Sequence, residues 1–214
     1  PSEKDLGATV TINNTTKTLA DFSPAVEIAN QKDFVTATAS GTRGANEESG
    51  VELTFAHQLS QIEIKAKNTN TGYVYKVVGV RIGKPVSKGT FTFGTNTWAL
   101  TTTEKANYAV EYTTPRTLAK DAATMMGTAN DNAMLLPQQL TAWASETGKP
   151  NTNNGAYIAL KIQITTAAGA QVYPAKNGEY DWAAVAVGTN WKAGKKYVYT
   201  LDFSKGAGKV DPEK

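Results

Sequence analysis

The sequence contains no cysteine, and this absence removes several classes of chemistry at once. Without thiols the chain has no disulfide framework, no thiolate nucleophile and no cysteine-ligated zinc site. Its stability must therefore come from packing and hydrogen bonding alone. The absence does not separate a protein of the cytosol from one of the cell exterior.

Histidine is almost absent too, since His57 is the only one in the chain. Hydrolases commonly use histidine as the base that activates a nucleophile, but no GxSxG elbow accompanies His57. It lies on the apolar side of an alternating segment, so we expect a core histidine that holds a neighbouring backbone group by hydrogen bonds. One histidine without cysteine also excludes the usual zinc ligand sets, and no calcium-binding loop motif occurs.

Carboxylate pairs could serve a glycosidase, but no motif in the sequence selects a pair among the acidic residues. We therefore expect that the protein is not an enzyme. We also expect no catalytic residue, no cofactor-binding residue, no metal ligand and no cofactor.

Positive charge is spread along the chain and does not form a stripe. The net charge is +3, and Arg43, Arg81 and Arg116 are the only arginines. Proteins that bind nucleic acids usually show a clustered basic surface, so we expect no nucleic-acid partner. No apolar run approaches the roughly 18 residues that span a bilayer, and residues 1–6 do not resemble a signal peptide. We expect no transmembrane segment in this chain.

Alternation of apolar and polar residues dominates what remains, and its clearest example is residues 51–67. Val51, Leu53, Phe55 and His57 share one parity, and the apolar residues shift to the other parity near Ser60. Alternation with period two is typical of a half-buried strand, and a phase shift is typical of a bulge or bend. We interpret this segment as a long, bent core strand.

Several other segments alternate in the same way. A further strand is predicted at residues 78–82, a hairpin at 91–100 around a Gly-Thr-Asn-Thr turn, and strands at 158–164 and 197–203. Helical patterning is scarce, with a short helix predicted at 117–126 and one turn at 24–30, where Ser23 is the expected N-cap before Pro24. The sequence therefore predicts an all-β, antiparallel β-sandwich with few short helices.

One change in composition marks a boundary. Residues 40–50 are small, polar and charged, which is typical of a linker or exposed loop. The segment before them has too few apolar residues for an independent core. We therefore predict that residues 1–45 are an appendage or the remnant of an N-terminal β domain, that 46–206 form the main sandwich domain, and that 207–214 are a tail.

Tryptophan offers the one alternative to a purely structural interpretation. Aromatic rings stack on sugars as well as they pack in cores. Trp182 and Trp191 flank an alternating segment, which favours core or edge packing. Trp143 follows Leu140 in an irregular stretch, so we expect it to be exposed and to serve as a ligand contact.

Four blocks of the sequence, taken in their order along the chain, carry a resemblance to a known family. They are LTFAHQLSQIEIKAKNTN (53–70), VVGVRIGKPVSKGTFTF (77–93), AMLLPQQLTAW (133–143) and VAVGTNWKAGKKYVYTLDFSKGAGKVDPE (185–213). Together they resemble the fimbrillin family of Bacteroidetes, the Mfa-like group with its major and tip fimbrial subunits. The family's F-x-H-x-L, LLPQ and W-x-x-G-x-x-Y-x-Y motifs fall on Phe55, His57 and Leu59, on Leu136, Pro137 and Gln138, and on Gly194, Tyr197 and Tyr199.

The resemblance implies a surface lipoprotein of the outer membrane, built from two transthyretin-like β-sandwiches and assembled into fimbriae by strand exchange between subunits. Residues 46–206 would form the C-terminal fimbrillin-like domain. The chain departs from the family pattern in having no signal peptide, no lipobox cysteine, a short N-terminal region and nothing after Lys214.

The implied partners are copies of the chain itself or related fimbrial subunits, and glycans or proteins of a host or bacterial surface. The implied location is the cell surface, in the fimbrium or at the outer membrane. A surface glycan- or protein-binding β-sandwich module is the alternative function. The subunit's place in the shaft, tip or anchor stays open.

Overall fold

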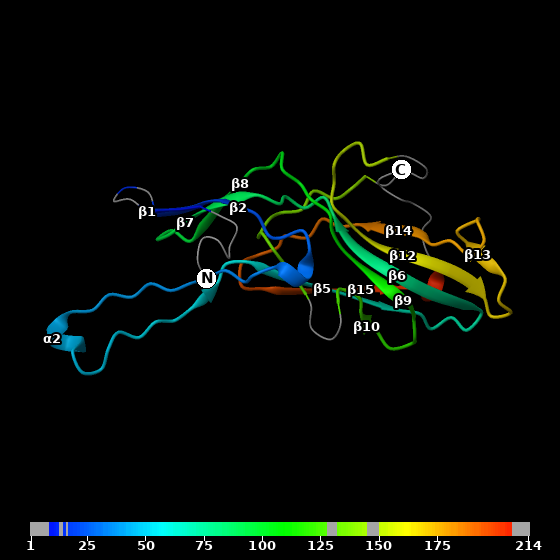
Figure 1. The fold of residues 1–214 in the computed structure, drawn as a ribbon, viewed down its shortest axis with the longest axis horizontal. Coiled ribbons are helices and arrows are strands. Elements are labelled where there is room, and N and C mark those ends of the chain that lie inside the picture. The colour runs from blue at the N-terminus through cyan, green and yellow to red at the C-terminus, as the bar shows by residue number, and fades with distance from the viewer. Residues whose placement is uncertain (1–8, 13–14, 16, 128–131, 145–149, 207–214) are drawn as a thin grey trace.

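The computed structural model describes residues 9–12, 15, 17–127, 132–144 and 150–206, and nearly all of their regular structure is β-strand (Figure 1). Two sheets face each other in the main body, and a third, smaller sheet lies beside them. The two sheets of the main body are named below after their central strands, β12 and β5.

The β12 sheet is antiparallel throughout. Strand β12 (Tyr157–Thr166) pairs along its whole length with β6 (Tyr73–Gly83), which pairs in turn with β9 (Tyr108–Thr117). On its other side β12 pairs with β14 (Asp181–Ala186) and with β13 (Gln171–Tyr173). Strand β14 is therefore an edge strand within the described chain.

The β5 sheet contains a parallel pair. Strand β5 (Ser60–Lys67) pairs antiparallel with β10 (Ala123–Thr124) and β11 (Ala133–Leu135), and parallel with β15 (Lys196–Asp202). The antiparallel pairing expected for residues 197–203 is therefore wrong. Side-chain alternation is the same in parallel and antiparallel strands, so the sequence pattern could not give the direction.

Alternating residues from both sheets form the main core. On β5, β6 and β12 the apolar positions of one parity are almost fully buried, as Ile64, Val80 and Leu160 illustrate with 0% exposure each. Burying an aliphatic side chain of this size contributes about 1.5–3 kcal/mol. The core between two sheets confirms the predicted all-β sandwich.

The third sheet joins the N-terminal part of the chain to the middle. Its order is β1 (Thr9–Ile12), β2 (Lys17–Phe22), β7 (Gly89–Thr92) and β8 (Thr97–Leu100). The β7–β8 pair confirms the predicted hairpin. Its inner face packs into an aromatic cluster formed by Leu19, Phe22, Phe34, Leu59, Phe91 and Leu136 with Phe93, Trp98, Leu100 and Met134.

This cluster bears on the predicted domain division. Residues expected to form an appendage share a sheet and a hydrophobic cluster with residues 89–100. The boundary at 45/46 stays a prediction, and the predicted tail at 207–214 lies outside the described residues.

The segment 51–57 is not the core strand that its alternation indicated. Val51, Leu53 and Phe55 are 43%, 52% and 63% exposed, and only β4 (Ala56–His57) is a strand, paired with β3 (Val35–Thr36). The phase shift near Ser60 does mark a real break, between β4 and β5. Alternation establishes that residues share a face, but it does not establish that another layer covers that face.

The helix predicted at 117–126 is also wrong. Leu118 donates its backbone N–H to Tyr75 O (2.9 Å) and Met125 donates to Ile64 O (2.7 Å), so the backbone is used for bonds between segments. Burial of Met125 and Met126 outweighs the modest helix propensity of the segment. In the 24–30 segment one helical turn does form, η1 (Ile28–Asn30), but Ser23 does not cap it, because its hydroxyl donates to Ser87 O (2.8 Å).

A buried carboxylate joins three strands of the β5 sheet. Glu63 of β5 is 7% exposed and accepts from Lys196 Nζ of β15 (2.7 Å) and from Thr124 Oγ1 of β10 (2.7 Å). The ammonium of Lys196, followed by the hydroxyl of Thr124, lowers the pKa of Glu63 to about 2. The ionised form is therefore favoured by folding.

Acid is expected to weaken the fold through this residue. Because the folded pKa lies below the unfolded value, the stabilisation is complete above the unfolded pKa and is lost as the pH falls toward 2, by up to about 3 kcal/mol. Urea unfolding of the wild type and of Glu63→Gln between pH 7 and pH 2.5 measures this loss of stabilisation. The variant should show a flatter pH dependence, and parallel curves for the two proteins would contradict the assignment.

Candidate functional site

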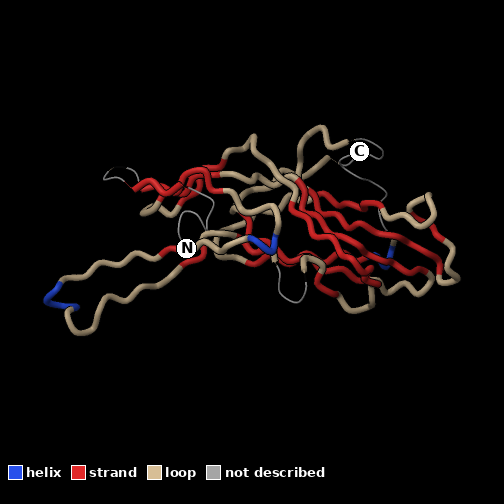
Figure 2. Tube along the Cα trace, in the orientation of Figure 1, coloured by secondary structure: helices blue, strands red, loops and turns tan. Residues whose placement is uncertain are grey.

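A long arm extends from the body of the protein (Figure 1). It comprises residues 37–55, two legs that run outward from β3 and β4 and are joined by the helical turn α2 (Arg43–Asn46) (Figure 2). Residues 40–50 are almost all exposed, which confirms the exposed loop predicted there. The arm reaches much further than a loop that merely connects two adjacent strands needs to.

The returning leg of the arm carries an uncovered apolar face. Val51, Leu53 and Phe55 occupy alternate positions, so in an extended chain their side chains point the same way, with Glu52 and Thr54 on the opposite side. Within the described chain no backbone hydrogen bond is formed by the N–H groups of residues 51–55. The leg therefore has an apolar face and free main-chain donors, the two features that a strand uses to join a sheet.

The base of the arm is fixed to the body. Gln58 donates its backbone N–H to Phe34 O (2.9 Å) and its side-chain amide to Thr36 Oγ1 (2.7 Å), while Trp98 Nε1 donates to Gln58 O (2.9 Å). Phe34 itself is buried in the aromatic cluster. These hydrogen bonds hold the base of the arm in one position on the body.

The tip of the arm is ordered by its own hydrogen bonds. The Asn46 side chain accepts from Thr42 N (3.1 Å) and donates to Gly50 O (3.0 Å). Gly50 has a φ of 72°, a left-handed conformation that glycine adopts without strain. Arg43 and Glu47 form an exposed ion pair at 3.0 Å, a contact that adds little stability.

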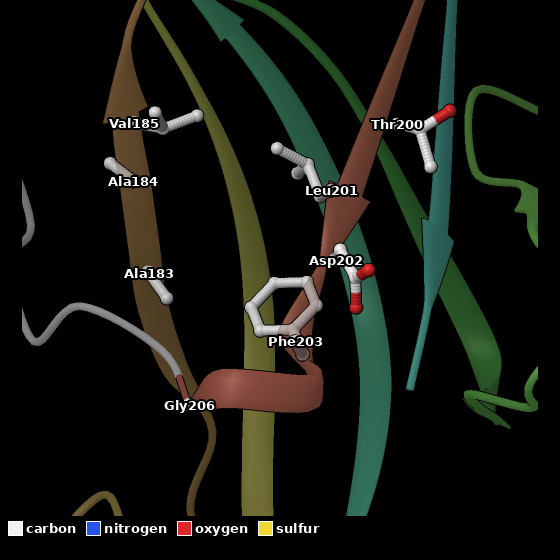
Figure 3. Close-up of a pocket in the computed structure, with 8 residues that line it drawn as sticks. All are labelled: Ala183, Ala184, Val185, Thr200, Leu201, Asp202, Phe203 and Gly206. Atoms are coloured by element: carbon white, nitrogen blue, oxygen red, sulfur yellow. The ribbon is translucent and has the colours of Figure 1, made fainter. Parts of the chain in front are cut away.

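A groove lies between the edge strands β14 and β15, and we name it the edge groove. It has a volume of about 250 Å³ and is lined by Ala183, Ala184, Val185, Thr200, Leu201, Asp202, Phe203 and Gly206. Figure 3 shows Ala183 and Val185 on one side of this space, Leu201 and Phe203 on the other, and Thr200 and Asp202 on the far side of β15.

The apolar side chains that face the edge groove, those of Ala183, Val185, Leu201 and Phe203, belong to the core side of the two sheets. Directly opposed residues on paired strands share a face, and Val185 is opposite the buried Ile158 while Leu201 is opposite the buried Ala66. Yet Val185 is 45% exposed. A residue on the core side stays exposed because no described strand covers this edge of the sandwich.

The unequal widths of the two sheets explain the opening. Across the described residues the β12 sheet is four strands wide, β14–β12–β6–β9, whereas the β5 sheet is only three strands wide, β15–β5 followed by the short strands β10 and β11 at different positions along β5. The β5 sheet ends one strand short on the side of β14. One additional strand on the free edge of β15 would cover Val185 and Leu201.

The free edge of β15 offers main-chain groups for such a strand. In the parallel register with β5, Tyr197, Tyr199 and Leu201 lie opposite Ile62, Ile64 and Ala66 and direct their peptide groups to β5. The intervening residues Val198 and Thr200 direct theirs outward, and within the described chain these groups have no backbone partner. A strand from another chain can bind there.

His57 lies at the base of the arm and not in the core. Its side chain is 63% exposed, and Nδ1 pairs with the carboxylate of Asp33. The prediction of a core histidine is wrong because β4 is a two-residue strand and both of its residues are exposed. Asp33 was not identified from the sequence, because the separation along the chain gives no indication that the two residues meet.

A second, smaller pocket lies next to His57, with a volume of about 230 Å³. Its lining consists of Asp33, His57, Leu59, Gln61, Met134, Gly194, Lys195 and Lys196. None of these described residues has a hydroxyl or thiol nucleophile, so the His57–Asp33 pair has no third member with which to form a triad.

Trp143 is buried, and the exposure predicted for it is wrong. It is 3% exposed, and its ring packs edge-on against Tyr157 with the centroids 5.9 Å apart. The irregular stretch that holds it folds back over the outer face of the β12 sheet, where Trp143 N donates to Ala156 O (3.0 Å). Its part as a ligand contact stays a prediction. Trp191 is buried and Trp182 half-buried, in agreement with the expected core and edge packing.

The described ranges contain neither a metal-binding cluster nor a membrane-spanning helix. No group of three or more acidic or histidine side chains there could hold a metal ion. None of the helices in those ranges is long and apolar enough to span a bilayer.

Sequence reasoning missed the edge groove and the free edge of β15. The alternation of residues 197–203 was recognised, but an edge strand and a central strand can show the same alternation when one face is polar. One weak indication was present in the sequence. Lys196, Thr200 and Asp202 lie on one face of β15, and such polar residues are typical of an exposed strand.

Comparisons with known proteins agree with this fold. No curated protein matches the chain. Among solved structures, a fimbrial protein from Bacteroides vulgatus is similar, with 15% sequence identity, a TM-score of 0.60, and coverage of 94% of this chain and 70% of that chain. A candidate cell adhesion protein from Bacteroides thetaiotaomicron has 13% identity, a TM-score of 0.43, and coverage of 94% and 65%.

At 15% identity the likeness to the Bacteroides vulgatus protein concerns the fold alone. The sequence itself carries the stronger finding, because it matches the profile of the fimbrillin-like family over residues 5–213. That match spans nearly the whole chain and agrees with the resemblance of its four sequence blocks. The chain belongs to the fimbrillin-like family.

Proposed function

We propose that this protein is a structural and adhesive subunit of a cell-surface fimbria, and that copies of it, or of related subunits, join by strand exchange at the free edge of β15. The family consists of structural and adhesive proteins, and the chain is accordingly not an enzyme. Its place of action in this proposal is the exterior of the cell, in the fimbrium or at the outer membrane.

The observation that carries the proposal is the exposure of the core at the edge groove. Val185 is on the core side of β14 and is 45% exposed, next to the unpaired peptide groups of Val198 and Thr200. An arriving strand would bury this apolar surface and satisfy the free main-chain groups at the same time.

The energies involved suit a stable junction. Each main-chain hydrogen bond contributes about 0.5–1.5 kcal/mol net, and apolar burial adds about 25 cal/mol per Å². Because the donor strand and the acceptor edge are different surfaces, the contact is head-to-tail and extends into a filament without closing.

A proline substitution on the free edge tests the proposal. Thr200 directs its backbone N–H away from β5, so Thr200→Pro removes a donor from the free edge and leaves the pairing with β5 intact. Thr200→Val keeps the N–H group and serves as the matched control. We expect filaments or soluble multimers from the wild type and from Thr200→Val, and monomers from Thr200→Pro.

Light scattering after size-exclusion chromatography, with negative-stain electron microscopy, measures assembly. Circular dichroism of each variant verifies that the fold is retained. Equal assembly by the proline variant and the wild type, or no assembly by any of the three proteins, contradicts strand exchange at β15.

A further inference from the structure

We propose that the donor strand is the returning leg of the arm, and that residues 51–55 of one copy occupy the edge groove of the next copy. This inference rests on the proposed function above, because it names the segment that pairs with β15. The complementary features of the arm and the groove are all found on the same chain.

The alternation of side chains in residues 51–55 fits the edge groove. When the leg is extended along β15, Val51, Leu53 and Phe55 point into the sandwich and cover the exposed side of Val185 and Leu201. Five residues of extended chain span about 13–17 Å, which is within the length of the seven-residue strand β15. The apolar face of the arm and the apolar opening of the groove would each be covered by the other.

Charge is complementary as well. In this orientation Glu52 lies on the outer face of the extended sheet, where Lys65 and Lys196 pair with Glu63 and Lys67 pairs with Asp202, so three lysines and two carboxylates leave a net charge of +1. Residues 37–55 carry Glu47, Glu48 and Glu52 against one arginine, whereas residues 190–206 carry four lysines against one aspartate. The opposite net charges of the two segments favour their encounter.

Location excludes a contact within one molecule. The tip of the arm, α2, lies at one end of the long axis, and the strands β14 and β15 that line the edge groove lie in the body, away from that end (Figure 1). The base of the arm is fixed by Gln58, Phe34 and Trp98. The arm therefore reaches outward to a neighbour, and one copy supplies both a donor and an acceptor.

Order in the free arm lowers the cost of binding. The tip is closed by the bonds of Asn46, and the base is fixed in the body, so the legs lose less conformational freedom on docking than a free terminus would. The legs themselves make no main-chain pairing to break, apart from the short β3–β4 pair. Docking adds hydrogen bonds without removing existing ones.

Disulfide trapping tests the inference directly, because introduced cysteines are the only thiols in this chain. Full-length Leu53→Cys is mixed with full-length Val185→Cys or with Leu201→Cys, oxidised mildly, and analysed for covalent dimers by denaturing electrophoresis. Val172→Cys is the matched acceptor control, since Val172 in β13 is also 45% exposed but does not line the groove. We expect at least about tenfold more dimer with a groove cysteine than with the control, because docking raises the effective concentration of the two thiols.

Each outcome of this experiment is decisive. Equal trapping by Val172→Cys, or covalent dimers from Leu53→Cys alone at the rate of the mixture, overturns the inference. Assembly that is blocked by Thr200→Pro but gives no trapping at Leu53 also overturns it, while the pairing at β15 stands. Failure of both experiments removes the proposed function as well.

A second set of variants avoids oxidation. Val51, Leu53 and Phe55 are exposed, so replacing all three with serine should leave the monomer folded and abolish assembly. The control replaces Glu52 and Thr54 on the opposite side of the leg by Gln and Ser, and this variant should still assemble. Normal assembly by the triple serine variant contradicts a donor role for the arm.

Discussion

Replacing Phe34 with alanine is expected to lower the free energy of unfolding by about 3–5 kcal/mol, the usual cost of deleting a buried aromatic ring. Phe34 is 5% exposed and lies at the centre of the aromatic cluster. Its ring centroid is 5.0 Å from that of Phe91, 5.9 Å from Trp98 and 6.0 Å from Phe22. Such ring pairs add about 0.5–1.5 kcal/mol each beyond area burial.

The consequence extends to the arm, because Phe34 immediately precedes β3. Its carbonyl accepts from Gln58 N (2.9 Å), so loss of the ring should also loosen the β3–β4 pair. Urea unfolding followed by tryptophan fluorescence measures the stability, and hydrogen exchange of residues 35–58 measures the loosening.

Phe55→Ala is the matched control for this prediction. It makes the same chemical change, but Phe55 lies on the arm and is 63% exposed, so the free energy of unfolding should stay within about 0.5 kcal/mol of the wild type. Similar destabilisation by the two variants would show that the burial of Phe34 has no effect on stability. It would contradict the claim that the aromatic cluster fixes the base of the arm.

Trp191→Ala is expected to have an effect of comparable size on the main core, again about 3–5 kcal/mol. Trp191 is 2% exposed, and its indole N–H donates to the hydroxyl of Tyr199 on β15 (2.8 Å). Removing the side chain leaves a cavity beside β15 and deprives Tyr199 of a donor. The variant should therefore loosen the edge at which we propose that copies join.

Trp191→Phe separates the two parts of this effect. It keeps most of the apolar volume and loses the hydrogen bond to Tyr199, for an expected cost of about 1–2 kcal/mol. The measurement is the denaturant midpoint of each variant, with the slope of the transition as a check on cooperativity. A midpoint for Trp191→Ala close to that of the wild type would exclude the close packing described around this residue.

The strands of the fold were largely predictable because alternation is a local property. The runs around Val80, Phe91 and Leu160 became β6, the β7–β8 hairpin and β12. In each case one face is buried and the other is wet or half-buried, which is the condition under which period-two patterning is informative.

The arm was not predictable, although its residues were noticed. Val51, Leu53 and Phe55 alternate as a core strand does, and nothing in the sequence distinguishes a face covered by its own chain from a face left open. A segment that binds a neighbour must carry the same pattern as a segment that binds its own core. In this protein the wrongly predicted core strand contains residues 51–55, the segment that we propose for assembly.

The edge groove was out of reach for a different reason. Its existence depends on the direction and order of strands, since β15 pairs in parallel with β5 and leaves Val185 uncovered. Those are relations between residues far apart in the chain, and the composition of either strand does not determine them. Burial of Trp143 and pairing of His57 with Asp33 were missed for the same reason.

The pairing of β15 with β5 also orders events in time. Lys196 can pair with Gln61 only after all of the intervening chain has been made, and contacts between residues so far apart in the sequence form late in folding. The acceptor surface therefore does not exist on a half-made copy. If copies join at β15 as proposed above, we expect that an emerging chain cannot accept a neighbour's strand before β15 itself has been made.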